Sequence, residues 1–188
     1  MKKKSFVMVL ALVLVFAVAV GGVVAWLTAT TGSVVNTFTV GDINIELKES
    51  DNLDLKMVPG NTIYKDPKVT VKANSEACWL FVKVEKANWN DNLTYTIENK
   101  NGWTFYKTDG NATYYYQKVD ATGATKQEIT VLDGNVVNVS ENLAKGEITA
   151  ANQPTLTFTA AAVQQENIAT VEKAFAQLPA SFTGAVAP

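Results

Sequence analysis

The residue types in this chain limit the chemistry that it can do. Its 188 residues include 16 lysines and 18 acidic groups but no histidine and no arginine, and Cys78 is the single cysteine. Without histidine there can be no Ser–His–Asp triad and no His-ligated zinc. Cys78 can form no disulfide within the chain, and its alternating apolar surroundings are typical of a small core residue. We therefore expect no catalytic residue, no metal site and no cofactor.

Acidic side chains offer two further kinds of chemistry, calcium binding and glycoside hydrolysis. Asp51 lies near Asp54, and Asp91 precedes Asn92, but neither pair has the spacing of a calcium loop. Ten Glu and eight Asp residues make many accidental carboxylate pairs, and nothing in the sequence distinguishes one of them. We interpret these side chains as solvated loop charges.

Two neighbouring segments are rich in aromatic residues, which makes them a candidate ligand surface. The residues are Trp103, Phe105, Tyr106, Tyr114, Tyr115 and Tyr116. A monomeric surface adhesin or carbohydrate-binding module that stacks sugars on Tyr114–Tyr116 is therefore an alternative function. Aromatic residues are also favoured as cross-strand pairs in β-sheets, and this structural interpretation is the simpler one.

Most of the chain alternates between apolar and polar residues, a pattern typical of half-buried β-strands. The clearest run is 78–85, and its apolar beginning on both faces favours a central strand. The turn at 109–111 lies between aromatic flanks and predicts a hairpin. Another long strand is predicted at 155–163. Shorter strands are expected at 38–40, 43–47, 52–58, 69–71, 93–97, 128–132 and 136–139.

Helical spacing is found only near the C-terminal end of the sequence. Ile168, Val171, Phe175 and Leu178 follow one another at three- and four-residue steps, which predicts one helix over 164–178, ended by Pro179. Residues 179–188 are expected to form a loose tail. Short strands with one helix predict an all-β fold, an antiparallel jelly-roll β-sandwich over residues 36–178.

The first 25 residues have the pattern of a secretory signal peptide. Lys2–Lys4 precede an apolar run, Gly21–Gly22 interrupts it, and Val23 and Ala25 supply compact residues before the cleavage point. We predict cleavage between Ala25 and Trp26, which leaves 13 lysines against 18 acidic groups, a net charge of −5. A retained membrane anchor is the alternative, because the uncharged run is long enough to cross a bilayer.

An uncharged, Thr-rich segment without proline follows the predicted cleavage point. Residues 26–35 have good β-propensity and carry none of the charges or prolines that keep a strand off a sheet edge. Such a segment can be a disordered terminus, the first strand of its own sandwich, or a strand donated to a groove in a neighbouring subunit. We predict donation, through Trp26, Leu27, Thr28, Ala29, Thr30, Thr31, Val34 and Val35.

Several stretches of the sequence resemble the TasA/camelysin family of Gram-positive bacteria. After the lysine-rich start and the glycine pair, the most specific stretch is 36–47, NTFTVGDINIEL. Similar stretches are PG at 59–60, KDPKVTVK at 65–72, CWLFVKVE at 78–85 and LTFTAAAVQ at 156–164, so the similarity spans residues 1 to about 165. Ala161 replaces an aromatic residue often seen in the family, a departure that concerns packing.

The resemblance implies a secreted jelly-roll subunit of extracellular, biofilm-matrix fibres. In this family a SipW-type signal peptidase processes the precursor, and the freed N-terminus completes the sheet of the next subunit. The implied partners are copies of the same chain in a head-to-tail homopolymer, the signal peptidase and an accessory matrix protein. Contact with a membrane is implied only through the uncleaved signal segment.

Two other kinds of function are disfavoured by the residues. Some family members carry a metallopeptidase label, but a chain without histidine has no HExxH motif, so we predict no enzyme activity. A nucleic-acid partner is not expected, because the net charge is negative and no basic cluster occurs beyond residue 4.

Overall fold

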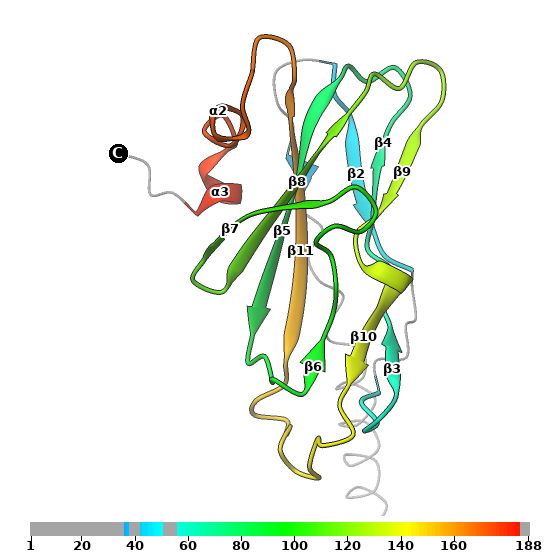
Figure 1. The fold of residues 1–188 in the computed structure, drawn as a ribbon, viewed down its shortest axis with the longest axis vertical. Helices are drawn as coiled ribbons and strands as arrows, with labels where there is room; N and C mark the ends of the chain where they lie inside the picture. The colour runs from blue at the N-terminus through cyan, green and yellow to red at the C-terminus, as the bar shows by residue number, and fades with distance from the viewer. Residues whose placement is uncertain (1–35, 38–41, 51–55, 185–188) are drawn as a thin grey trace, which may run out of the picture. The chain divides into compact units, whose positions relative to one another are not determined.

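The computed structural model describes residues 36–37, 42–50 and 56–184, all within one structural unit, Ser33–Pro188. Most of the elements in this part are β-strands, and the helices are short, which confirms the all-β prediction (Figure 1). The elements are β1 (Asn36–Thr37), β2 (Ile45–Lys48), β3 (Thr62–Tyr64), β4 (Lys68–Val71), β5 (Cys78–Ala87), β6 (Leu93–Thr94), β7 (Thr104–Asp109), β8 (Ala112–Val119), β9 (Gln127–Thr130), the 3-10 turn η1 (Asp133–Asn135), β10 (Val136–Val139), β11 (Thr155–Gln164), α2 (Val171–Phe175) and α3 (Ala180–Thr183).

Five strands form what we call the long sheet, in the order β1-β11-β5-β8-β7. All neighbouring pairs are antiparallel except β1 and β11, which run parallel. β5 pairs with β11 on one side and with β8 on the other, so it is the central strand, as the sequence predicts. The predicted hairpin at 109–111 joins β7 to β8.

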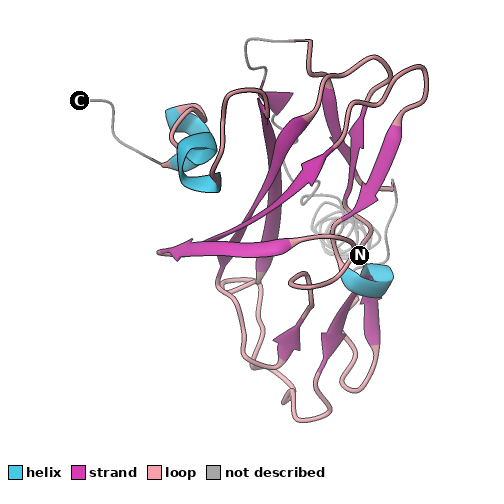
Figure 2. Cartoon of the chain, turned by 45° about the horizontal axis from the view of Figure 1, so that its top comes forward, coloured by secondary structure: helices cyan, strands magenta, loops and turns pink. Residues whose placement is uncertain are grey.

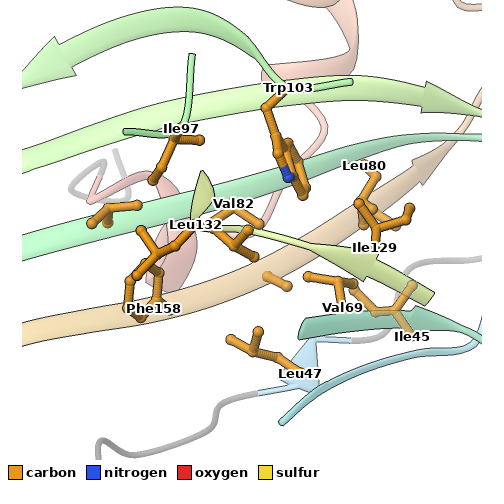
Figure 3. Packing of buried hydrophobic residues seen from close by; sticks show 14 of the residues in the cluster. Ile45, Leu47, Val69, Leu80, Val82, Ile97, Trp103, Ile129, Leu132 and Phe158 are labelled. Carbon is orange, nitrogen blue, oxygen red and sulfur yellow. The ribbon is translucent and has the colours of Figure 1, made fainter. Parts of the chain in front are cut away.

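Two three-stranded antiparallel sheets, β2-β4-β9 and β3-β10-β6, lie against one face of the long sheet (Figure 2). The core between these layers consists of alternate residues of the strands. Leu80, Val82 and Phe158 of the long sheet pack with Leu47 and Val69 of the second layer, and all five side chains are buried (Figure 3). Successive side chains of a strand point to opposite faces, so the predicted alternating runs at 43–47 and 69–71 place their apolar residues inward.

The other face of the long sheet is also buried, because the C-terminal segment covers it. Trp79, Phe81 and Tyr114 form a second apolar cluster with Phe175 and Phe182. The ring centroids of Phe81 and Phe175 are 5.7 Å apart, and those of Tyr114 and Phe182 are 5.8 Å apart. β5 is therefore buried on both faces, which explains its continuous apolar beginning.

The prediction of one helix over 164–178 is wrong. β11 extends to Gln164, and Asn167 has a φ of 61°, a left-handed conformation that a right-handed helix cannot continue through. α2 begins only after Thr170, whose Oγ1 accepts a hydrogen bond from the backbone N–H of Lys173 at 3.4 Å. The helical spacing of the apolar residues therefore predicts only α2 and the turn after it, up to Leu178.

The loose tail predicted for 179–188 is wrong for residues 179–184, the part that the structure describes. Pro179 precedes α3, and Phe182 within this helix is 1% exposed. Gly184 ends the helix with a φ of 71°, which glycine adopts without strain. The segment is ordered because an aromatic side chain close to the chain end finds an apolar surface on the long sheet.

Some predicted strands are shorter than expected or lie outside the described residues. The run 93–97 is a strand only at Leu93–Thr94, and the carbonyl of Thr96 accepts a hydrogen bond from the N–H of Asp133, the first residue of η1. Of the strand predicted at 52–58, residues 56–58 are not in a strand, and the rest is outside the described part. Residues 38–40 also lie outside it.

Candidate functional site

The predicted site residues at the N-terminus lie outside the described residues. This holds for the cleavage site at Val23, Ala25 and Trp26 and for the whole predicted donor segment, 26–35. The first described residues after that segment are Asn36 and Thr37, which form β1. The candidate site is therefore the border of the long sheet at which β1 joins the fold.

β1 covers a small part of the border strand β11. Asn36 is paired with Ala160 and Thr37 with Ala161, whereas β11 is paired with β5 over its full length, from Thr155 to Gln164. Within the described residues, 155–159 thus have a neighbouring strand on the β5 side alone. The outer side of an edge strand presents backbone N–H and C=O groups that a further strand can bind.

The outer side of β11 between Thr155 and Thr159, called here the β11 edge, has no protection of its own. Its residues are uncharged and include no proline, and the pairing of β11 with β5 runs without a register shift. Leu156 and Phe158 face the core, and the threonines alternate with them. Natural edge strands are usually protected by charges, prolines or bulges; residues 155–159 have none of these, and the nearest proline, Pro154, directly precedes them.

The opposite border of the long sheet, β7, is protected. Its pairing with β8 shifts register between Phe105 and Lys107, which marks a bulge at Tyr106. Two charged residues also lie on this strand, with 3.8 Å between Lys107 Nζ and Asp109 Oδ2. A bulge interrupts the regular series of hydrogen bonds that an added strand would need.

The border strands of the second layer are short, and two of them are charged. β2 carries Glu46 and Lys48, which are 2.7 Å apart, and β9 carries Glu128, 2.6 Å from Lys126. β3 and β6 have three and two residues. Among the described strands, β11 is therefore the border that combines length, regularity and lack of charge.

The six aromatic residues proposed as a ligand surface do not form one platform. Trp103 is buried between the layers, and its Nε1–H donates to the carbonyl of Thr130 at 2.9 Å. Tyr114 lies beneath α3, and its hydroxyl donates to the carbonyl of Thr183 at 3.1 Å. Burial, with Asp109 and Glu85 nearby, raises the pKa of Tyr114.

The other aromatic residues divide between the two faces of the long sheet. Tyr106 and Tyr116 pack with Phe81 on the face that the C-terminal helices cover. Phe105 packs against Tyr115, with 6.1 Å between the ring centroids, and Tyr115 contacts the core between the layers. Tyr114–Tyr116 therefore cannot present one flat stacking surface, because Tyr115 points the opposite way from its neighbours.

Among the remaining candidate groups, the structure describes Cys78, Asp91 and Asn92. Cys78 is buried, and burial raises the pKa of its thiol to about 12. Glu147 accepts hydrogen bonds from the amides of Asn90 and Asn92 at 2.9 and 3.0 Å, and the first of these lowers its pKa most. Asp51 and Asp54 lie outside the described residues. The described part contains no group of three or more Cys, Asp or Glu residues placed to hold a metal ion.

The described part of the chain also contains no helix that is long and apolar enough to span a membrane.

Comparison with known proteins adds no assignment. No family model matches the chain, and no curated protein and no solved structure matches it. The family resemblance therefore rests on the residues quoted above, and the functions that it implies are proposals.

The β11 edge could not be recognised from the sequence. The run 155–163 predicts a strand, but nothing in it predicts a position at the border of a sheet.

Proposed function

We propose that this protein is an exported, non-enzymatic subunit that polymerises into fibres of the extracellular matrix or cell surface. Each subunit would donate residues 26–35 to a sheet of its neighbour. One observation supports this above all: β1, which directly follows the donor segment, joins the long sheet beside the β11 edge. The segment is uncharged and β-prone, and the strand that follows it in sequence joins a border of the kind that accepts strands.

Signal-peptide cleavage would control assembly. While residues 1–25 hold the chain at the membrane, its N-terminal segment cannot reach a sheet in another subunit. Cleavage after Ala25 by a SipW-type signal peptidase frees the segment, which then adds to a neighbouring sheet by β-augmentation. Head-to-tail donation does not close on itself, so repeated donation produces a filament. An accessory matrix protein fits this scheme as a nucleator of assembly.

The jelly-roll classification belongs to the same proposal. The long sheet faces a second layer of two smaller sheets across a single core. This two-layered, mostly antiparallel arrangement is compatible with a jelly roll, in which two packed sheets manage their edges by closing over each other.

Removing the donor segment tests the function. The mature chain, beginning at Trp26, is expected to form fibres that negative-stain electron microscopy detects. A variant that lacks 26–35 is expected to stay a folded monomer, because it loses the donor but keeps the layers and their core. Removing 185–188 at the other end is the matched control and should leave assembly intact. Fibres formed by the variant without 26–35 would show that this segment is not the donor.

The structure offers no comparable support for the monomeric carbohydrate-binding alternative. Tyr114 is covered by α3, and Tyr115 faces away from Tyr114 and Tyr116. Binding of glycans by a chain that shows no concentration-dependent assembly would favour that alternative.

A further inference from the structure

We propose that the acceptor of the donated segment is the β11 edge, Thr155–Thr159, with the apolar side of the donor over Leu156. This inference rests on the proposed function and names the surface at which two copies of the chain meet. The backbone of β11, the side chains of the two strands and the length of the donor all support it.

The borders of the three sheets differ in how well their backbone can accept a strand. A donated strand needs a regular run of residues in which every second residue presents its N–H and C=O groups outward. β11 supplies these between Thr155 and Thr159, next to the two positions that β1 covers. β7 is interrupted by the bulge at Tyr106, and the borders of the second layer are at most four residues long.

Side chains on the two strands are complementary. On β11, Leu156 and Phe158 face the core, while Thr155, Thr157 and Thr159 face the other side of the sheet. Leu156 packs on the core but is only partly buried, so apolar surface remains at this border. Over residues 27–30 the donor alternates in the same way, with Leu27 and Ala29 on one side and Thr28 and Thr30 on the other; Trp26 shares the side of the threonines.

This alternation sets which faces meet. Leu27 and Ala29 would lie on the side of Leu156, where they complete its burial, and Thr28 and Thr30 would lie beside the threonines of β11. A shift of one residue would place the threonines over the apolar side, so the pattern disfavours it.

The donor is long enough to leave its own subunit. Residues 26–35 span about 33 Å when extended, and the five positions of the β11 edge need about 17 Å. β1 runs parallel to β11, so the residues before Asn36 must turn away from β11 of their own subunit, and the rest of the segment can then bridge to the neighbour. Residues 26–35 are therefore long enough both to cover the β11 edge and to link two subunits.

Engineered cysteines test the contact directly. Neighbouring strands place opposed Cα atoms about 4.5–5.5 Å apart, within the range for a disulfide. A chain with Thr157→Cys is mixed with a differently tagged chain carrying Thr28→Cys or Thr30→Cys, assembled and then oxidised. We expect a disulfide-linked heterodimer on a non-reducing gel with at least one of the two donors. The native Cys78 is buried and does not interfere.

Two matched controls use the same gel. Ala29→Cys in the donor should not link to Thr157→Cys, because its side chain lies on the opposite face. Thr108→Cys on β7 should not link to any of the three donors. Links through Thr108, or no link at Thr157 in preparations that contain fibres, would overturn the β11 assignment.

Charge on the edge supplies a second, independent measurement. Thr155 and Thr157 are half-buried, so the pair Thr155→Lys and Thr157→Lys can be solvated in the monomer but obstructs strand addition. We expect a folded monomer, checked by circular dichroism, that no longer serves as an acceptor and forms no fibres. The pair Thr104→Lys and Thr108→Lys on β7 should assemble normally.

The outcomes separate this inference from the proposed function. If the unmodified mature chain forms no fibres, both fail. If fibres form but the lysine pair on β11 has no effect and no link appears at Thr157, the acceptor lies elsewhere and fibre formation by the chain stands.

Discussion

The indole of Trp103 lies at the centre of the packing between the layers. It is 1% exposed, and its Nε1–H donates a hydrogen bond to the carbonyl of Thr130. The approach to this position is a tight turn, in which Asn101 and Gly102 have φ values of 51° and 84°. Asparagine tolerates this left-handed region better than other side chains, and glycine adopts it without strain. The turn therefore delivers a large, rigid side chain into the core.

Replacing this tryptophan should lower the stability of the domain. Trp103→Phe removes the hydrogen-bond donor, leaves the Thr130 carbonyl without its partner and creates a void, so we expect about 2–3 kcal/mol less free energy of unfolding. Urea unfolding followed by circular dichroism measures this. Phe105→Leu, at an exposed position two residues away, should cost less than about 1 kcal/mol. Equal losses for the two variants would contradict the position of Trp103 in the core.

At the scale of elements, the C-terminal helices act as a cover for the long sheet. α2 and α3 have five and four residues, too few to be stable alone, so tertiary packing must hold them in place. Phe175 and Phe182 supply that packing. The amino group of Lys107 lies 4.6 Å from the centroid of the Phe175 ring and adds a cation–π contact.

Truncating the last buried aromatic residue tests this cover. Phe182→Ala should lower the free energy of unfolding by about 3 kcal/mol, because the side chain is fully buried against Tyr114. Ser181→Ala, an exposed neighbour in the same helix, should stay within about 0.5 kcal/mol of the unmodified protein. Urea unfolding distinguishes this from a loose tail, for which neither substitution would matter.

At the scale of the whole molecule, the charged side chains are all lysines and carboxylates, and these determine how stability depends on pH. Hydrogen bonds from Asn90, the Ala144 N–H and Asn92 hold the pKa of Glu147 below its ordinary value, and Lys126 does the same for Glu128. A carboxyl whose pKa is lowered by folding contributes stability above its unfolded pKa and loses that contribution as the pH falls through the folded value. The chain has no histidine, so it lacks the side chain that normally titrates near neutral pH.

The stability of the domain should therefore be nearly constant between about pH 6 and pH 8 and fall in acid, below the ordinary carboxyl pKa of about 4.5. The urea midpoint measured across this range checks the expectation. A marked change of the midpoint between pH 6 and pH 8 would contradict it, because it would show that a group titrates in this range.

Local patterns were enough to predict the longer strands and part of the core, but not β3. Period-two alternation placed Ile43, Ile45, Leu47, Val69 and Val71 on buried faces, and the doubly apolar run at 78–85 marked a central strand. These predictions succeed because side-chain direction in a strand depends on sequence position alone. The predictions of one long helix and a loose tail failed because Asn167 interrupts the helix and Phe182 has a remote partner in Tyr114.

The sequence by itself excluded sites in this chain that need a histidine side chain, because the absence of histidine does not depend on the fold. It also supplied an uncharged, β-prone N-terminal segment as a candidate donor. Only the tertiary structure decided where a strand can be received. Whether a strand lies at a border depends on its neighbours, and β11 has β5 on one side and only β1, at Ala160 and Ala161, on the other within the described residues.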